Sequence, residues 1–374
     1  MTNPILQLEA LGQSLWYDNI RRGLLRSGAL EAMIQSGEIR GVTSNPSIFN
    51  QAIARSSDYD DALAQLAKSS LTAEEIFWRL AVEDIQAVAD LFQPLYERSN
   101  RGDGYISLEV NPGLANDAAQ TLAEAKGLWK RVGRPNLMVK IPATKEGIPA
   151  IEQAVAAGLN INVTLIFSLA RYAEVMEAYL CGLESRVSAG LPVDGIASVA
   201  SFFVSRVDTK VDAALKSLID SGGAAADPAR RLLGKAAIAN AKLAYQLFRD
   251  TFGADRFQRL ARQGARLQRP LWASTSTKNP AYRDVLYVEE LIGADTVNTA
   301  PPQTIDAFRD HGIAEATLTR DVGQAKEDLD QLVPLGISME QVTDELEAEG
   351  VESFKEAFRE LVQTIEGRRR QAAA

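Results

Sequence analysis

Histidine and cysteine are almost missing from this sequence, which has 374 residues but only one of each, His311 and Cys181. One cysteine excludes a disulfide framework within the chain and a site with several thiolate ligands. One histidine excludes, in addition, a metal centre of clustered histidines. Cys181 lies in a helical pattern, where we expect it to pack, and His311 precedes Gly312 at an expected helix end. Acid–base chemistry in this chain must therefore use carboxylates rather than histidine.

Long hydrophobic runs and an excess of positive charge are also missing. No stretch approaches the length of a membrane span, and the first residues do not place a basic segment before an apolar one, as an export signal does. We therefore expect a cytoplasmic protein. The formal net charge of -9 argues against a nucleic-acid-binding surface. It does not argue against a small anionic substrate, because local groups set the field inside a pocket.

Eight short strands alternate with helices along the chain. We expect strands at residues 14–18, 41–45, 105–110, 137–141, 161–167, 196–204, 270–274 and 296–299. We expect helices at about 3–13, 20–27, 28–36, 47–55, 58–68, 72–97, 115–132, 147–157, 169–189, 207–265 (broken at 221–223 and 252–253), 285–291, 303–310, 322–333 and 338–366, the last divided at Gly350 and fraying from residue 368. This alternation predicts a parallel sheet, and eight units predict one (β/α)8 barrel domain over residues 1–374, with additional C-terminal helices.

An open, doubly wound sheet is the alternative architecture. Such a sheet usually binds phosphates with a glycine fingerprint in its first turn, and no G-x-G-x-x-G follows any expected strand. Gly234 and Lys235 are followed by alanine within a helical stretch, so they do not form a phosphate-binding P-loop. These absences favour the closed barrel.

A lysine lies inside the apolar strand of residues 137–141, which Pro142 closes because proline cannot donate to a ladder. Successive side chains of a strand point to opposite faces, so Lys140 shares a face with Met138, and the aliphatic residues take the other face. If helices cover the aliphatic face, Lys140 points into the barrel. An ammonium group is costly to bury without a partner, and the neutral amine is what a Schiff-base nucleophile needs. The alternative is a lysine at a strand end that reaches water along its stem.

Nearly every expected strand carries polar or ionisable residues late in the strand, on one face. In a (β/α)8 barrel the active site lies at the C-terminal ends of the strands, so these side chains should surround one mouth. In strand order they are Asp18; Thr43 and Asn45; Ser107 and Glu109; Lys140; Asn162 and Thr164; Ser201 and Phe203, followed by Arg206; Ser274, followed by Lys278; and Thr296 and Asn298. Any one of them is readily explained as a hydrogen-bonded residue at a strand end. The whole set is not, because buried polar groups are costly unless they are paired.

A polar mouth around one lysine indicates Schiff-base chemistry. An amine that attacks a ketone needs acids and bases to move protons through the carbinolamine, and Asp18 and Glu109 are the candidates. Arg206, Ser274 and Lys278 would suit a phosphate group, with solvated loop charges as the alternative for the two cations.

Four segments resemble the signature segments of transaldolase: Thr43-Ser-Asn-Pro-Ser47, Val139-Lys-Ile-Pro-Ala-Thr144, Asn162-Val-Thr-Leu-Ile-Phe167 and Ser201-Phe-Phe-Val-Ser-Arg206. The resemblance runs in order from about residue 14 to residue 298, and the length is similar to that of the longer bacterial transaldolases. It implies a barrel of the class I aldolase kind that needs no metal or cofactor, with a C-terminal helix across the barrel mouth. It implies sugar-phosphate substrates and a monomer or homodimer without nucleic-acid or membrane partners.

The activity implied by the resemblance is the transfer of a dihydroxyacetone unit from sedoheptulose 7-phosphate to glyceraldehyde 3-phosphate, which gives erythrose 4-phosphate and fructose 6-phosphate. By the resemblance, Lys140 forms the Schiff base, and Asp18 takes the C4 hydroxyl proton during C–C cleavage. Glu109 acts through a water held by Thr164 when the carbinolamine forms and dehydrates. The resemblance implies that Asn45 and Asn162 bind the dihydroxyacetone hydroxyls, with Ser201 nearby, and that Arg206 and Ser274 bind the phosphate. We also expect Thr43, Phe203 and Lys278 to contact the substrate.

One departure from the family pattern follows strand seven. Many transaldolases carry Ser-Phe-Arg-Asn there, whereas this chain reads Ser274-Thr-Ser-Thr-Lys-Asn279, so that Lys278 would replace the arginine at a different spacing. The related fructose-6-phosphate aldolases carry glutamine where Glu109 stands and tyrosine where Phe203 stands, so this sequence sides with transaldolase. Two further alternatives are a pyridoxal-phosphate barrel enzyme, which also uses a lysine imine, and a non-catalytic barrel that binds sugar phosphates.

Overall fold

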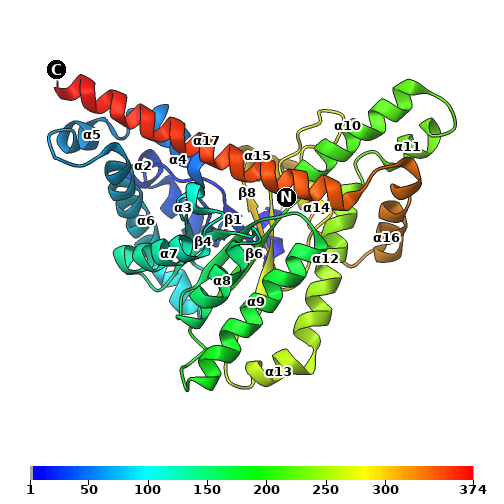
Figure 1. Ribbon diagram of the computed structural model, residues 1–374, viewed down its shortest axis with the longest axis horizontal. Helices are drawn as coiled ribbons and strands as arrows, with labels where there is room; N and C mark the ends of the chain where they lie inside the picture. The colour runs from blue at the N-terminus through cyan, green and yellow to red at the C-terminus, as the bar shows by residue number, and fades with distance from the viewer. Residues whose placement is uncertain (1–2, 374) are drawn as a thin grey trace.

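Eight parallel strands close into a barrel in chain order in the computed structural model, which describes residues 3–373 (Figure 1). The strands are β1 (Gln13–Tyr17), β2 (Gly41–Val42), β3 (Tyr105–Glu109), β4 (Leu137–Pro142), β5 (Ile161–Ile166), β6 (Ser198–Phe203), β7 (Gln268–Ala273) and β8 (Thr296–Ala300). Helices alternate with the strands along the chain and surround the barrel in Figure 1. The predicted (β/α)8 barrel is confirmed.

The helices differ widely in length. They are α1 (Ile5–Leu8), α2 (Arg22–Arg26), α3 (Ala29–Gln35), α4 (Pro46–Ala54), α5 (Asp60–Leu66), α6 (Ala73–Arg98), α7 (Ala118–Val132), α8 (Gly147–Ala156), α9 (Leu169–Ser188), α10 (Ser205–Ser221), α11 (Ala226–Leu232), α12 (Ala236–Gly253), α13 (Asp255–Ala261), α14 (Leu286–Glu289), α15 (Pro302–His311), α16 (Val322–Asp330) and α17 (Met339–Ala373), with short 3-10 helices η1 (Pro112–Leu114) and η2 (Val333–Leu335). The first helix is shorter than predicted. The region predicted at 207–265 has one break more than expected, at Gly234, which has a φ of +71° and donates its N–H to Asp212 at 2.9 Å.

Strand β2 ends earlier than predicted. The prediction that it continues to Asn45 is wrong, because the Asn45 side chain accepts a hydrogen bond from the Ile48 N–H at 3.0 Å and caps helix α4. Asn45 and Thr43 therefore lie in the loop that leads from β2 into α4, at the C-terminal end of the barrel. Strand β5 also departs from simple alternation, because its register against β6 shifts between Val163 and Ile166 and Leu165 has a φ of +60°.

The C-terminal helix α17 crosses the molecule over the C-terminal end of the barrel (Figure 1). It packs against α4, α6 and α10 and touches strand β5. The predicted division at Gly350 is wrong, because the helix is continuous from Met339 to Ala373. Gly350 instead permits close approach: a Cβ atom there would lie 2.9 Å from Leu165 Cδ2. The predicted C-terminal helix across the barrel mouth is confirmed.

The end of α17 is held by the body of the protein. Arg368 Nη1 donates to Asp60 Oδ1 at 2.9 Å, and Arg369 Nη1 donates to the Leu71 carbonyl at 2.6 Å. The prediction that the chain frays at residues 368–370 is therefore wrong. Two arginines in the last turns complete the attachment of α17 on the side of α5.

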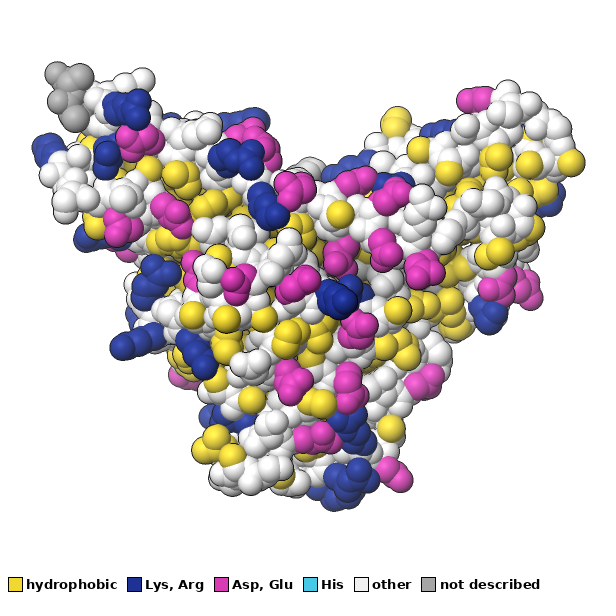
Figure 2. All heavy atoms as spheres, in the orientation of Figure 1, with side chains coloured by type: hydrophobic (Ala, Val, Ile, Leu, Met, Phe, Trp, Pro, Cys, Tyr) yellow, Lys and Arg dark blue, Asp and Glu magenta, His cyan; other side chains and the backbone are white. Residues whose placement is uncertain are grey.

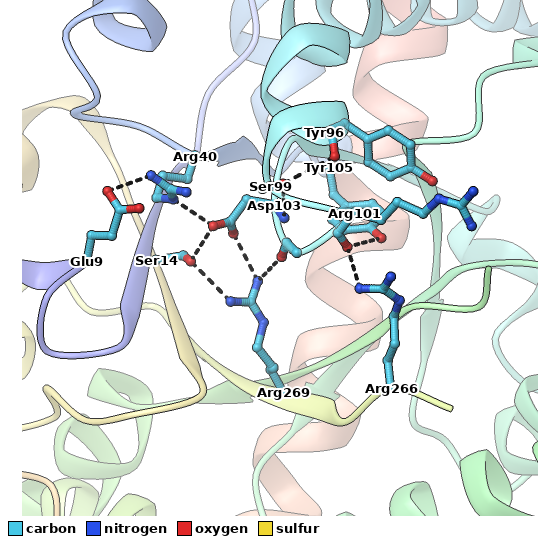
Figure 3. Close-up of polar contacts among 11 residues, drawn as sticks. Glu9, Ser14, Arg40, Tyr96, Ser99, Arg101, Asp103, Tyr105, Arg266 and Arg269 are labelled. Atoms are coloured by element: carbon cyan, nitrogen blue, oxygen red, sulfur yellow. Dashed lines mark hydrogen bonds and ion pairs between the residues drawn. The ribbon is translucent and has the colours of Figure 1, made fainter. Parts of the chain in front are cut away.

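A network of charged residues closes the opposite, N-terminal end of the barrel (Figure 3). The buried carboxylate of Asp103 accepts hydrogen bonds from Arg40 Nε at 2.6 Å and from Arg269 Nη2 at 3.0 Å. Ser14 Oγ donates to the same carboxylate at 3.0 Å and accepts a hydrogen bond from Arg269 Nη1 at 3.1 Å. Arg40 also pairs with Glu9 at 2.8 Å. The cations and carboxylates of this end thus neutralise one another.

The surface carries charges of both signs. On the face drawn in Figure 2, acidic and basic side chains are interspersed, and neither sign gathers into one continuous patch. Among residues 3–373, no helix combines the length and the apolar character that crossing a membrane requires.

Candidate active site

A cavity of about 360 Å³ opens at the C-terminal ends of the strands, beneath helix α17. Predicted site residues from most of the strands line it together: Asp18, Thr43, Asn45, Lys140, Ser201, Phe203, Arg206, Ser274 and Lys278. Ser107, Thr296 and Asn298, which were also expected around the mouth, do not line the cavity. Neither do the other three predicted catalytic and binding residues, Glu109, Asn162 and Thr164. They lie on the strands beside Lys140, since Glu109 and Asn162 pair with Lys140 in register and Thr164 pairs with Pro142.

Lys140 is buried at the floor of this cavity, with a side chain that is 5% exposed. Its Nζ atom lies 3.4 Å from Glu109 Oε2 and donates to the Ser44 carbonyl at 3.3 Å. The ring of Phe354, on α17, has its centroid 5.8 Å from the same nitrogen. The alternative in which Lys140 reaches water along its stem is therefore wrong, because carboxylate, carbonyl and aromatic groups surround the amine.

Two carboxylates flank Lys140, and burial changes the acidity of both. Burial raises the pKa of Glu109 to about 7, while the Lys140 ammonium group opposes this shift. Burial also raises the pKa of Asp18, against the effects of Lys140 and of a hydrogen bond that Thr43 Oγ1 donates at 2.6 Å. Thr43 Oγ1 lies 2.5 Å from Thr299 Oγ1, which extends this hydrogen-bonded chain to β8. A carboxyl group with a pKa of about 7, as in Glu109, can both hold and release a proton near neutral pH.

A chain of hydroxyl and amide groups crosses three strands beside Lys140. Asn162 Nδ2 donates to Ser107 Oγ at 2.9 Å, and Ser201 Oγ donates to Asn162 Oδ1 at 2.7 Å. These bonds fix the orientation of the Asn162 amide, while Ser201 faces the cavity. Within residues 3–373, Thr164 Oγ1 is buried without a hydrogen-bond partner, and the two carboxylate oxygens of Glu109 have only the ion pair with Lys140. Buried polar atoms of this kind need a partner from a bound molecule or from water.

The other end of the cavity is basic. The guanidinium carbon of Arg206 lies 5.4 Å from the centroid of the Phe203 ring, and burial lowers the pKa of Arg206. The charge of Glu349, on α17, opposes this lowering. Ser274 has a φ of +57° and lies 3.0 Å, between hydroxyl oxygens, from Ser205 at the start of α10. Lys278 Nζ donates to Ser276 Oγ at 2.6 Å. Two cations and two hydroxyls thus face one end of the cavity, as binding of a phosphate group requires.

Several residues that line the cavity were not predicted. They are Asn19, Ser47, Ile48, Gln51, Ala273, Ser276, Thr299, Pro301, Pro302, Gln303 and Phe354. Ser276 had a sequence signal, because it lies between Ser274 and Lys278 at alternate positions of one loop. Phe354 had none, because its spacing on the last helix is equally that of a residue that only packs.

Comparison with known proteins agrees with this geometry. Residues 15–365 match the model of the family described as Transaldolase/Fructose-6-phosphate aldolase. The chain belongs to this family. Transaldolase 1 of Streptomyces coelicolor is 47% identical over 355 residues, which cover 95% of this chain and 92% of that protein. Transaldolase 1 of Streptomyces avermitilis is 46% identical over 369 residues (98% and 96%), and the transaldolase of Trichodesmium erythraeum is 45% identical over 372 residues (98% and 97%). The resemblance inferred from four short segments therefore extends over nearly the whole chain.

Proposed function

We propose that this chain is a transaldolase, which moves a dihydroxyacetone unit from sedoheptulose 7-phosphate to glyceraldehyde 3-phosphate through an imine on Lys140. The observation that carries the proposal is the position of Lys140, buried at the floor of the mouth cavity and 3.4 Å from Glu109. The relatives at 45–47% identity over nearly their whole length are named transaldolases, which supports the same assignment.

The first step is attack of the neutral Lys140 amine on the ketone carbon of the sugar. A carbinolamine forms and then loses water, so a nearby group must take the proton that the nitrogen loses and give protons to the oxygen that leaves as water. Glu109 is placed for this role by its distance to Lys140 and by a pKa of about 7. The unpartnered hydroxyl of Thr164 supports the expectation that a water joins Thr164 to Glu109 during these proton transfers.

The second step breaks the bond between C3 and C4 of the sugar. A base removes the proton of the C4 hydroxyl, the electron pair of the C–C bond moves into the imine, and an aldehyde leaves. Asp18 suits this role, because it lines the cavity close enough to Lys140 to feel its charge, and burial raises its pKa. The enamine that remains on Lys140 then attacks the aldehyde of the acceptor, and the same steps run in reverse.

Binding residues divide the cavity into two halves. We assign Asn45 and Ser201, near Lys140, to the hydroxyls of the dihydroxyacetone unit. Asn162 supports them from outside the cavity lining, through its hydrogen bond with Ser201. Thr43 positions Asp18 through its hydrogen bond. We assign Arg206, Ser274 and Lys278 to the phosphate group, because they form the basic end of the same cavity.

A free aldolase of the fructose-6-phosphate type is the second candidate, since the family includes both activities. The two enzymes differ in whether the enamine waits for an acceptor aldehyde or is protonated and released as free dihydroxyacetone. Phe203 favours transfer, because its ring packs between Phe167 and Arg206 and offers no proton to the cavity. A tyrosine at this position would supply a hydroxyl beside the intermediate.

The test follows free dihydroxyacetone formed from fructose 6-phosphate, with and without erythrose 4-phosphate as the acceptor. We expect rapid transfer with the acceptor and slow release without it, and we expect Phe203→Tyr to shift the balance toward release. Rapid release by the unsubstituted enzyme in the absence of acceptor would assign the free aldolase activity instead. Absence of both transfer and release would favour a non-catalytic barrel.

A further inference from the structure

The loop that follows β7 supplies three residues to the basic end of the cavity. Ser274, Ser276 and Lys278 alternate along it and all line the cavity. Apart from turns, the loop has no regular structure until α14 begins at Leu286. A lysine side chain is long and flexible, so its place opposite a phosphate depends on how firmly its backbone is held.

Helix α10 holds the beginning of this loop. The Ser205 N–H donates to the Ser274 carbonyl at 3.0 Å, and the hydroxyl oxygens of the same two residues lie 3.0 Å apart. The next residue, Thr275, donates to Asn298 Oδ1 of β8 at 2.8 Å. The first two residues of the loop are therefore fixed to the rim of the barrel.

Helix α10 also holds the second half of the loop and the start of α14, through two buried carboxylates one helical turn apart. Tyr282 OH donates to Asp212 Oδ2 at 2.6 Å, and Tyr287 OH donates to Asp208 Oδ2 at 2.8 Å. Asp208 and Asp212 are 1% and 5% exposed. We call these four residues the tyrosine–aspartate clamp. A hydrogen bond from a neutral donor to a buried carboxylate is among the stronger ones in proteins, so each contact resists displacement of the loop.

The two carboxylates of the clamp are themselves held in place. The Ala237 N–H donates to Asp208 Oδ1 at 2.7 Å, and the Gly234 N–H donates to Asp212 Oδ1 at 2.9 Å. A Cβ atom at Gly234 would lie 2.8 Å from the Tyr282 ring, so glycine is needed for the ring to approach. The clamp thus joins the loop to α10 and to the segment between α11 and α12.

The clamp lies directly behind the basic end of the active site. A second cavity of about 330 Å³ is lined by all four clamp residues, and Lys278 lines both this cavity and the active-site cavity. The same helix that carries the clamp carboxylates carries Arg206 at its second residue. One rigid element therefore places Arg206 directly and Lys278 through the two tyrosines.

We propose that the tyrosine–aspartate clamp is a positioning device for phosphate recognition, which holds Ser276 and Lys278 opposite Arg206 so that together they select phosphorylated substrates. This inference rests on the proposed function. Because Lys140 and Glu109 lie on other strands and Asp18 directly follows β1, loss of the clamp weakens the contact with the phosphate and leaves the imine chemistry intact. The clamp residues act through Lys278 and do not touch the substrate.

The test compares erythrose 4-phosphate with unphosphorylated erythrose as the acceptor for dihydroxyacetone from fructose 6-phosphate. We expect Tyr282→Phe and Tyr287→Phe each to lower kcat/KM for erythrose 4-phosphate about tenfold, mainly through KM, and to leave kcat/KM for erythrose unchanged. Tyr179→Phe is the matched control, because it removes a buried tyrosine hydroxyl bonded to the Arg266 carbonyl, far from the loop. It should leave the ratio between the two acceptors unchanged.

A double-mutant cycle with Lys278→Ala tests whether the clamp acts through the lysine. We expect Tyr282→Phe to have little further effect on the acceptor ratio when Lys278 has already been replaced, because the two changes remove the same contact. Equal loss of activity toward both acceptors, or fully additive effects in the cycle, would overturn the inference. If the unsubstituted enzyme forms no imine with fructose 6-phosphate, the proposed function fails and the inference fails with it. If it forms the imine and the clamp variants keep the acceptor ratio, the inference fails alone.

Discussion

The two ends of the barrel use buried charge in opposite ways. At the N-terminal end, Asp103 accepts hydrogen bonds from two guanidinium groups and a hydroxyl (Figure 3). At the C-terminal end, the carboxylate of Glu109 has one ion pair, at 3.4 Å, and no hydrogen-bond partner in the described part of the chain. The Asp103 carboxylate is fully paired and holds strands together, whereas the oxygens of Glu109 remain available to a substrate or a water. In barrels of this kind, stability resides at the first end and chemistry at the second.

Replacement of Lys140 by arginine should have the largest effect on activity. A guanidinium group keeps a positive charge beside Glu109 but is never deprotonated in a protein, so it forms no imine. We expect turnover to fall by about a thousandfold or more, with the thermal unfolding midpoint close to that of the parent. The measurements are initial rates of dihydroxyacetone transfer and a thermal melt. Retained turnover in Lys140→Arg would remove the lysine from the mechanism.

Asp103→Asn tests the opposite end. It leaves the two guanidinium groups without their shared carboxylate, and breaking a buried ion pair costs on the order of 3 kcal/mol of unfolding free energy. We expect a clearly lower unfolding midpoint, with kcat/KM unchanged in the fraction that remains folded. Loss of activity without loss of stability would contradict the division between the two ends.

Glu109→Gln, at the C-terminal end, should affect activity more than stability. We expect slow imine formation and a smaller change in the unfolding free energy than Asp103→Asn causes.

The pH dependence of stability should report the Glu109 carboxyl. Its pKa in the folded chain, about 7, is raised above the value for an exposed glutamate because burial disfavours the charged form. The folded state therefore binds the proton more tightly than the unfolded state, and this group makes stability fall as pH rises through the range from about 4.5 to about 7. As pH rises through this range, Glu109→Gln should therefore become more stable relative to the parent. Denaturant unfolding at several pH values measures this difference in unfolding free energy, with the exposed Glu327→Gln as the control for loss of one negative charge.

Gly350→Ala should have the smallest effect. The new Cβ atom would lie 2.9 Å from the end of the Leu165 side chain, so α17 or Leu165 must shift slightly above the cavity. This crowding offsets the gain of about 1 kcal/mol that alanine normally brings to a helix. We expect a modest rise in KM and little net change in stability. Gly367→Ala, on the same helix with no atom within 4 Å of its new Cβ, should gain stability and keep KM.

Periodicity and strand-end polarity were enough to predict the barrel and much of the mouth. Lys140, Asp18 and Arg206 reach one cavity because strand ends converge in a closed parallel sheet, which the alternation of strands and helices already implies. The division of the last helix at Gly350 was predicted wrongly, since local propensity does not reveal that a glycine serves close approach to Leu165. The length of β2 was missed because Asn45 caps a helix instead of extending the strand.

Other features depend on contacts between distant parts of the sequence. Phe354 covers Lys140 only because a helix from the end of the chain packs over the end of strand β4. The hydrogen bonds from Tyr282 and Tyr287 to α10 join residues about 70 or more positions apart, and no local pattern marks them. Such contacts are decided by tertiary packing, to which a single sequence gives no direct signal.

The most direct measurement is chemical trapping of the imine. The protein is incubated with fructose 6-phosphate, reduced with borohydride and mapped by peptide mass spectrometry. The reduced sugar adduct should be found on Lys140 and on no other lysine, because Lys140 is the lysine buried beside Glu109 at the floor of the cavity. An adduct on Lys145 or Lys278, with Lys140 unmodified, would contradict the account.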